Sequence, residues 1–266
     1  MEAAGLGAFM VSASLFGTLL EHPASPVRAW IAFPSARRAL MGIAMGLTAI
    51  AIIRSPWGRR SGAHINPATT LTFWRLGKVA PADALTYVAA QFLGAAGGMG
   101  IAALLLPGLL SDPAVNWVAT LPGPWGLSVA LGGELLISFV MMLVVLIASN
   151  SATLSRHTAV LAGALVALFI TFEAPLSGMS LNPARSFGSA LAAGDFSSLW
   201  IYFTAPPLGM LAAAEVFVRT RGMRAVHCAK LDHHNSQPCI FRCRFGALLA
   251  QGEAASGASP GSGGKG

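Results

Sequence analysis

Charged residues are scarce in this chain of 266 residues. Lys, Arg, Asp and Glu together make up 10% of it, against 55% hydrophobic residues, and the mean hydropathy is +0.65. So few charges cannot cover the water-facing surface of a soluble domain of this length. The composition therefore excludes an ordinary soluble protein and predicts a chain that is surrounded by lipid.

Cysteine is missing from the first 227 residues, because all three cysteines lie near the C-terminus. No disulfide framework can therefore support the apolar part of the chain. Acidic residues are also few, 10 against 17 basic ones, which gives a formal net charge of +7. In a soluble protein that excess would suggest nucleic acid, but here the basic residues lie between apolar segments and in the tail, so no nucleic-acid partner is predicted.

Long apolar segments are what the sequence has in abundance. About 20 apolar residues are needed for a helix to cross the roughly 30 Å hydrocarbon layer of a bilayer. Six segments qualify, over residues 2–20, 39–54, 82–106, 127–149, 158–174 and 197–218. With both termini in the cytoplasm, 13 of the 17 Lys and Arg residues lie on the cytoplasmic side and 4 outside, as the positive-inside rule requires.

A short polar motif occurs twice among these segments. Asn66-Pro67-Ala68 and Asn182-Pro183-Ala184 each follow a Ser-Gly pair at the same offset, Ser61-Gly62 and Ser177-Gly178. Each copy opens an apolar stretch of half a span, over residues 67–76 and 183–193, and such half-helices are tolerated in a membrane only inside protein or beside a water-filled cavity. The sequence predicts an all-α membrane protein with six transmembrane helices and two re-entrant half-helices, built as an inverted repeat of residues 1–106 and 127–220.

The chemistry of the motif points to a pore. Asparagine is favoured at a helix N-cap and proline at the first helical position, so each copy predicts a helix start, and the two starts point at one spot. The side-chain amides of Asn66 and Asn182 can then donate to a passing oxygen, and the two helix dipoles repel cations. The backbone carbonyls before each turn would accept hydrogen bonds from a passing solute in place of its hydration water. The residues predicted to supply these carbonyls are Gly62, Ala63, His64, Ile65, Gly178 and Ser180. The alternative, two capped core helices, leaves the duplication unexplained.

Three further residues are candidates for roles in or around the pore. Arg185 follows the second motif on an otherwise uncharged half-helix, and a membrane-embedded arginine is by default a functional candidate. It is expected to offer donors to solutes at the outer constriction. The side chain of His64 is equally compatible with a buried structural role and with contact to solute. Glu134 is expected to accept hydrogen bonds from loop N–H groups, since a buried carboxylate must be paired.

The two motif blocks resemble the signature loops of the major intrinsic proteins, the aquaporins and glycerol facilitators, and the chain is similar to bacterial-type aquaporins over residues 1–220. The resemblance implies a right-handed six-helix bundle, a homotetramer, and Glu2 and Glu134 as a pair of buried structural acids. It also implies a selectivity filter of Met45, Ile170, Met179 and Arg185. An alignment to the family pattern without a gap would place Gly46 in the filter instead of Met45, and a shift of one residue would place Thr171 there instead of Ile170.

The predicted filter lacks the histidine that narrows strict water channels, and its methionines are flexible. Ser186, Ala190, Tyr202 and Phe203 resemble the aquaporin pattern instead. The prediction is a passive channel in the plasma (inner) membrane that conducts water and small neutral solutes such as glycerol, excludes ions and needs no cofactor and no metal in the pore. A glycerol or small-solute facilitator, an inverted-repeat secondary transporter and, more remotely, a membrane enzyme are the alternatives.

The tail is the feature outside the family pattern. The channel domain is predicted over residues 1–224 and a largely disordered cytoplasmic tail over 225–266, which ends in a Gly/Ser-rich stretch. This tail holds Cys228, His233, Cys239 and Cys243, whose thiolate and imidazole groups could bind zinc or form a redox-sensitive cluster. Their spacing matches no zinc motif closely, so incidental thiols in an unstructured tail are the competing interpretation.

Overall fold

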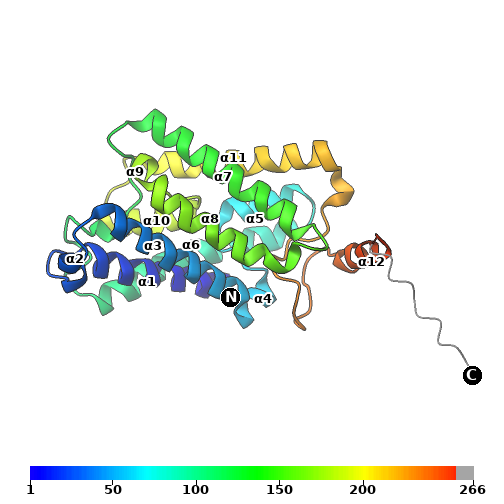
Figure 1. Cartoon of the computed structure of the whole chain (residues 1–266), viewed down its shortest axis with the longest axis horizontal. Helices are drawn as coiled ribbons and strands as arrows, with labels where there is room; N and C mark the ends of the chain where they lie inside the picture. The colour runs from blue at the N-terminus through cyan, green and yellow to red at the C-terminus, as the bar shows by residue number, and fades with distance from the viewer. Residues whose placement is uncertain (256–266) are drawn as a thin grey trace, which may run out of the picture.

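The computed structural model describes residues 1–255, and Figure 1 shows them as a bundle of long helices with shorter helices at its ends and between them. No strand occurs within these residues. The α-helices are α1 Glu2–Glu21, α2 Pro26–Trp30, α3 Pro34–Arg54, α4 Pro56–Ser61, α5 Pro67–Arg75, α6 Pro81–Leu105, α7 Leu127–Ser149, α8 Thr158–Phe172, α9 Ala174–Ser177, α10 Pro183–Ala193, α11 Leu199–Arg221 and α12 Phe245–Ala255. Three 3-10 turns span Asn116–Val118, Ser155–His157 and Met223–Ala225.

Six helical segments are long and apolar enough to cross a membrane, and they are the six that the sequence predicts. The largest difference lies at the start of α3, which begins at Pro34 rather than at residue 39. Proline is favourable at a helix start, and the charge that follows is paired, because Arg37 Nη2 lies 3.0 Å from Glu21 Oε2. Side chains on the outside of the bundle are apolar, as for Leu104, which is 84% exposed. These surfaces suit contact with lipid chains.

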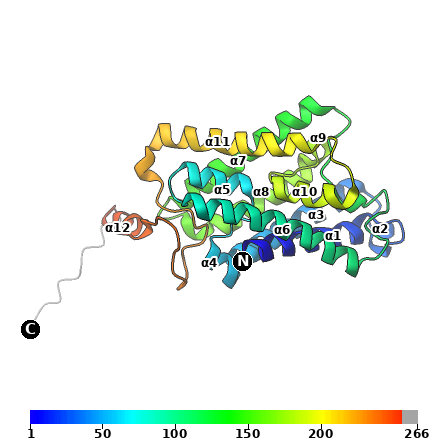
Figure 2. The ribbon, with the colours of Figure 1, turned by 180° about the vertical axis from the view of Figure 1, so that it is seen from behind.

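The two halves of the chain are arranged as an inverted pair. The half-helices α5 and α10 lie between the long helices, α5 toward the end that carries α12 and α10 toward the end that carries α2 (Figures 1 and 2). Each packs against the last long helix of the other half, α5 on α11 and α10 on α6. The start of the chain, α4 and α12 lie at one end of the bundle. This arrangement is expected, because a chain that crosses a membrane six times returns to the side on which it began.

Small residues let the long helices approach closely. At the crossing of α3 and α8, a Cβ on Gly46 would lie 2.5 Å from the carbonyl oxygen of Gly163, so no larger residue fits there. Helices in membranes associate mainly through such close packing. Gly46 therefore faces α8, while its neighbour Met45 is left to face the interior of the bundle.

The described part of the tail differs from the predicted disorder. Val226, Cys228, Ala229, Lys230 and Leu231 are buried, and their segment is held by hydrogen bonds to loops of the bundle. The tail is rich in polar residues, but its backbone is bonded to the bundle: His227 N–H donates to Asn150 Oδ1 at 2.6 Å, for example. The Gly/Ser-rich end, with Gly261, Gly263, Gly264 and Gly266, lies outside the described residues.

Candidate functional site

One elongated cavity of about 380 Å³ runs through the bundle between its two halves. Its lining extends from Glu21 and Arg38 at the end near α2 to Ile53 and Leu231 at the end near the tail. Helices α1, α3, α7 and α8 and the segments before α5 and α10 form much of the wall, and single residues of α5, α10, α11 and the tail add to it. The predicted site residues that line it are Met45, Ala63, His64, Ile65, Asn66, Ile170, Gly178, Met179, Ser180, Asn182 and Arg185.

The two motifs begin their half-helices as their residue types predict. Asn66 Oδ1 accepts from the N–H of Ala68 at 2.9 Å, and Asn182 Oδ1 accepts from Ala184 at 3.1 Å and from Arg185 at 3.2 Å. Pro67 and Pro183 occupy the first helical position, where the missing N–H would have no partner anyway. The side-chain oxygens of both asparagines are therefore fixed by the caps, which aims their amide nitrogens away from the half-helices.

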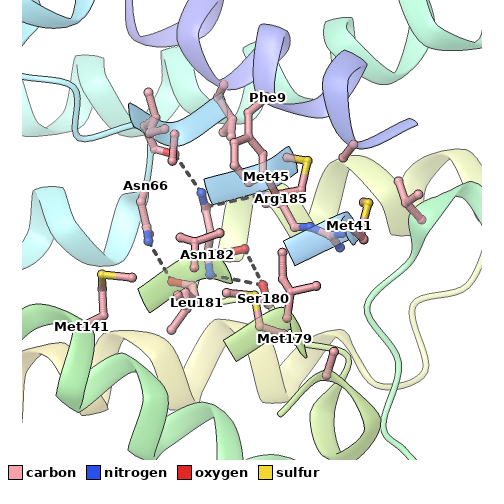
Figure 3. A pocket seen from close by; sticks show the side chains of 18 of the residues that line it. Phe9, Met41, Met45, Asn66, Met141, Met179, Ser180, Leu181, Asn182 and Arg185 are labelled. Atoms are coloured by element: carbon pink, nitrogen blue, oxygen red, sulfur yellow. Dashed lines mark hydrogen bonds between the residues drawn. The ribbon is translucent and has the colours of Figure 1, made fainter. Parts of the chain in front are cut away.

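Each amide nitrogen joins its own motif to the other one. Asn66 Nδ2 donates to the carbonyl of Leu181 at 2.8 Å, and Asn182 Nδ2 donates to the carbonyl of Ile65 at 2.7 Å. This reciprocal pair is visible in part in Figure 3. The sequence predicted that the two side-chain amides donate hydrogen bonds to solute. In the structure, one N–H of each amide already donates to a backbone carbonyl of the other motif. A primary amide carries two N–H donors, so one on each asparagine stays available to the cavity.

The segments before the motifs have a strained backbone that repeats between the halves. Gly62 and Gly178 are left-handed, as are four residues with side chains: Ala63 at φ 56°, Ile65 at φ 41°, Met179 at φ 48° and Leu181 at φ 60°. Each such residue costs about 1 to 2 kcal/mol. Left-handed residues within these segments prevent a right-handed helix, so the backbone N–H and C=O groups of both segments are left for other partners.

The two buried acids hold these strained segments. Glu2 accepts from the Ser61 hydroxyl at 2.7 Å and from the Ile65 N–H at 2.6 Å. In the other half, Glu134 accepts from the Ser177 hydroxyl at 3.0 Å, from the Ser180 N–H at 2.5 Å and from the Leu181 N–H at 2.9 Å. Both acids are buried, and their oxygens are used by the loops. These contacts fit the bracing role predicted for Glu134 and the pairing of Glu2 with it.

The four residues predicted as a filter line the same cavity, and Figure 3 shows Met45 and Arg185 next to each other with Met179 nearby. Arg185 is half-buried, and its buried Nη1 atom has no hydrogen-bond partner among the described residues. A buried guanidinium donor without a protein partner is available to a solute oxygen. Gly46, the alternative to Met45, is absent from the lining and packs on α8.

Two predicted pore groups have partners that limit their contact with solute. His64 uses both ring nitrogens within the protein, Nδ1 with Thr70 Oγ1 at 3.1 Å and Nε2 with the carbonyl of Ala229 at 2.9 Å. Its side chain therefore takes the structural role of the two that the sequence left open. Gly62 does not line the cavity, and its carbonyl accepts from the N–H of Leu231 at 3.3 Å. The prediction of Gly62 as a pore carbonyl is corrected, because the tail binds that oxygen.

Sequence reasoning missed several residues of the wall. Arg38, Met41 and Phe9 line the cavity. Met41 lies near Arg185 and Phe9 faces the cavity from α1, and both are labelled in Figure 3. Arg38 Nε donates to the carbonyl of Thr171 at 2.9 Å. The signal for Met41 was present, since Met41, Met45 and Ala49 recur every four residues and so share one face of a helix. No comparable pattern marks Arg38.

The four tail residues with zinc-binding groups lie together at the end of the bundle that carries α12. One ligand atom from each of Cys228, His233, Cys239 and Cys243 lies within 4.8 Å of the other three. The hydrogen bond from the Cys228 thiol stabilises the thiolate of Cys239 and lowers its pKa to about 6. The cysteines are free in this structure rather than joined in a disulfide.

Comparison with known proteins gives consistent matches. The family model described as "Major intrinsic protein" matches residues 8–217. The chain is 37% identical over 177 residues, 66% of its length, to "Aquaporin NIP2-3" of Zea mays, and 32% identical over 213 residues, 79% of its length, to "Aquaporin NIP1-1" of Zea mays. These matches span 56% and 67% of the two relatives' own lengths.

A solved structure has the same fold. The X-ray structure of the aquaglyceroporin from Plasmodium falciparum superimposes with a TM-score of 0.64 at 21% identity, covering 81% of this chain and 92% of that one. At this identity the likeness concerns the arrangement of helices. It confirms the predicted all-α membrane fold with six spans and two half-helices.

Proposed function

Because this chain belongs to the major intrinsic protein family, we propose that it forms a passive membrane channel for water and small neutral solutes. The observation that carries the proposal is the reciprocal pair of motif amides at the centre of a cavity that extends along the bundle. Two helix N-termini meet there, and each asparagine keeps one N–H for a passing oxygen. A water molecule held by two fixed donors cannot readily relay a proton.

Exclusion of ions follows from the same geometry. The N-terminal ends of α5 and α10 place positive potential at the middle of the cavity. The guanidinium of Arg185 adds a full positive charge close to Met45. A cation would meet both in turn, with few carboxylate oxygens free to stabilise it, because Glu2 and Glu134 are bonded to the loops. Neutral solutes avoid this barrier.

The residues at the constriction favour a second, broader solute range. Met45, Ile170 and Met179 give the wall around Arg185 three aliphatic or thioether side chains and no imidazole. Methionines adapt their shape to a guest, and Arg185 Nη1 offers a donor to a hydroxyl group. We therefore include glycerol or a similar small polyol among the solutes of this channel, beside water.

A coupled transporter is less well supported. It would place ionisable groups in the membrane where they can bind a coupling ion. Glu2 and Glu134 are buried at matching positions, but each accepts hydrogen bonds from its own motif loop. Such acids fix a rigid loop rather than a site that must load and unload an ion.

We further propose a homotetramer in the plasma (inner) membrane with both termini in the cytoplasm. Support for the orientation comes from charge. Arg54, Arg59 and Arg60 lie at or near α4, at the same end of the bundle as the tail with its Arg242 and Arg244. A concentration of basic residues on one side is typical of the cytoplasmic face.

The main test is osmotic water flow. Protein reconstituted in liposomes should accelerate shrinkage under a sucrose gradient, with a low activation energy and no ionic current, because water crosses a preformed path. Stopped-flow light scattering and planar-bilayer recordings measure the two quantities. Empty liposomes prepared in parallel give the lipid background. Uphill solute uptake driven by a proton or sodium gradient would refute the passive channel.

The width of the filter has its own test. Ile170→His should lower glycerol permeability by on the order of tenfold while water flow persists, because a ring with a polar edge replaces an aliphatic chain at the constriction. Ile170→Val, which adds no bulk, is the matched control and should keep polyol flow. Swelling assays in glycerol report both. If the unmodified protein passes no polyol, or if Ile170→His changes nothing, the wide-filter interpretation is wrong.

A further inference from the structure

The segment 226–245, here called the tail clasp, folds back over the end of the bundle from which the chain emerges after α11. It is tied to three separate segments of the bundle. His227 N–H donates to Asn150 Oδ1 at 2.6 Å, Arg242 N–H donates to the carbonyl of Lys78 at 3.2 Å, and Asp232 Oδ2 accepts from Arg59 Nε at 3.1 Å. Such ties require that the clasp itself has a defined shape, although it contains neither a helix of useful length nor a strand among its described residues.

What could define that shape is the group of ligand atoms inside it. The sulfur atoms of Cys228 and Cys239 lie 3.4 Å apart, and Cys243 Sγ lies 3.8 Å from His233 Nε2. All four ligand atoms fall within 4.8 Å of one another. Zinc bound tetrahedrally, with bonds of about 2.3 Å to sulfur and about 2.0 Å to nitrogen, sets its ligand atoms about 3.3 to 3.8 Å apart. The cluster therefore already has approximately the dimensions of a zinc site.

The surroundings of the cluster suit a bound metal. The N–H of Lys230 points to Cys228 Sγ at 3.5 Å and the N–H of Phe245 points to Cys243 Sγ at 3.4 Å. Backbone donors of this kind stabilise thiolates and orient them toward a metal. The His233 ring is stacked on Phe245 with a centroid distance of 4.1 Å, which fixes its plane. Three thiolates and one imidazole form the Cys₃His set of structural zinc sites.

The other interpretations explain less. Incidental thiols in a loose tail would have no reason to meet a histidine, yet the three cysteines of the chain and His233 converge on one point. A disulfide between Cys228 and Cys239 would use two of the cysteines and would not explain why Cys243 and His233 lie beside them. Magnesium and calcium prefer oxygen ligands, of which the cluster has none, whereas thiolates and imidazole select zinc.

We propose that Cys228, His233, Cys239 and Cys243 bind one Zn²⁺ ion, and that this ion holds the tail clasp against the inner mouth of the cavity. The clasp reaches that mouth through three contacts. The carbonyl of Ala229 bonds to His64 Nε2 at 2.9 Å, Leu231 N–H donates to the carbonyl of Gly62 at 3.3 Å, and Phe241 stacks on His64 with a centroid distance of 5.3 Å. Leu231 itself lines the cavity.

The metal fixes these contacts because its ligands bracket them in sequence. Ala229 and Leu231 lie between Cys228 and His233, and Phe241 lies between Cys239 and Cys243. With zinc bound, both stretches become short loops that are closed at each end, so they lose little further entropy when they dock. Without zinc, the clasp is expected to detach from the segment that precedes α5.

Metal content of the full-length protein purified in detergent is the direct test. Mass spectrometry of the metal should find about one zinc ion per chain, and replacement by Co²⁺ should produce the absorption bands of a tetrahedral thiolate site. Cys239→Ser should weaken zinc binding by at least about 100-fold in competition with a chromophoric chelator, since losing a ligand exceeds the 10- to 100-fold effect of losing a ligand's own partner. His234→Ala is the matched control, because His234 bonds to Ser155 outside the cluster and should leave zinc binding intact.

Proteolysis tests the second part of the proposal. Trypsin should cut at Lys230, Arg242 or Arg244 at least about tenfold faster after zinc is removed with a chelator, and added Zn²⁺ should restore resistance. Unchanged cleavage after zinc removal would overturn the docking role. Reduced protein that holds no zinc and gives no cobalt bands would overturn the metal site, as would a Cys228–Cys239 disulfide in its place. If Cys239→Ser does not fold, the cobalt spectrum of the unmodified protein decides. None of these readouts depends on water or solute flow.

Discussion

Replacing Glu134 by leucine is expected to abolish the folded channel, although this side chain does not line the cavity. Three donors point at its carboxylate: the Ser177 hydroxyl and the N–H groups of Ser180 and Leu181. Leucine fills a similar volume but accepts none of them. Each buried donor left without an acceptor costs about 1 to 3 kcal/mol. The total, about 3 to 9 kcal/mol, is comparable with the 5 to 15 kcal/mol that stabilise a typical fold.

The strained loop makes this loss worse. Met179 and Leu181 adopt left-handed conformations that need support from their surroundings, and the carboxylate supplies it. When this support is removed, the loop should relax and the carbonyl of Leu181 should move away from Asn66 Nδ2, which breaks one of the two bonds between the motifs. The loss of the Glu134 carboxylate in one half of the channel should therefore also disturb the position of Asn66 in the other half.

Size-exclusion profiles of a fluorescent fusion and thermal unfolding in detergent measure the effect. Glu134→Leu should give aggregated protein, or protein that unfolds at least about 10 °C below the unmodified chain. Glu215→Leu is the matched control. Its exposed carboxylate pairs with Arg219 and Arg75 at the surface, and such pairs contribute about 1 kcal/mol or less. Equal unfolding temperatures for the two variants would mean that the carboxylate of Glu134 does not hold the loop.

Local chemistry made much of the fold predictable. Asparagine followed by proline favours a helix start, and both half-helices begin at those prolines. The six spans follow from apolar segments of sufficient length, and their number is confirmed. The same applies to the cavity wall, since Met179 and Arg185 lie within three residues of a motif asparagine whose position is fixed. In each case the residues that determine the local structure are close to one another in the sequence.

Interactions between distant segments could not be predicted in the same way. That Asn66 donates to Leu181 depends on how the two half-helices meet, and Arg38 enters the wall only because α3 begins at Pro34 and crosses α8. The tail is the clearest case. Its polar composition predicted disorder, yet the hydrogen bond between Ala229 and His64 joins residues 165 positions apart. Composition describes what a segment prefers in water and contains no information about partners that the fold brings to it.

Replacing Arg185 by valine is expected to have the largest effect on selectivity. The guanidinium lies beside Met45 and Met41 in the cavity (Figure 3), and its buried Nη1 has no hydrogen-bond partner among the described residues. Valine removes several heavy atoms, a positive charge and the donors offered to solute, and the side chains of Met41 and Met45 that remain beside it are apolar. Neutral solutes larger than glycerol, such as a four- or five-carbon polyol, should then pass on the order of tenfold faster, which corresponds to a barrier lower by about 1.4 kcal/mol.

The loss of charge has a separate consequence from the loss of bulk. With Arg185 absent, the middle of the cavity is protected from cations by the dipoles of α5 and α10, each of which counts for about half an elementary charge. The remaining arginine of the lining, Arg38, lies toward the end near α2. A measurable proton or cation leak is therefore expected in Arg185→Val liposomes, whereas Arg185→Lys, which keeps the charge and sheds bulk and donors, should admit larger polyols without the leak. A pH-sensitive dye inside the vesicles reports the leak, and swelling assays report the solutes.

Arg221→Val provides the control for a general effect of removing an arginine from a helix. Arg221 is exposed at the last residue of α11, outside the cavity, so its replacement should change neither polyol size limits nor ion leakage. If Arg185→Val kept the solute range of the unmodified protein, its side chain could not stand at the narrowest point, and the constriction would have to lie elsewhere along the cavity. If only the leak appeared, the guanidinium would act through its charge alone and the width would be set by Met45, Ile170 and Met179.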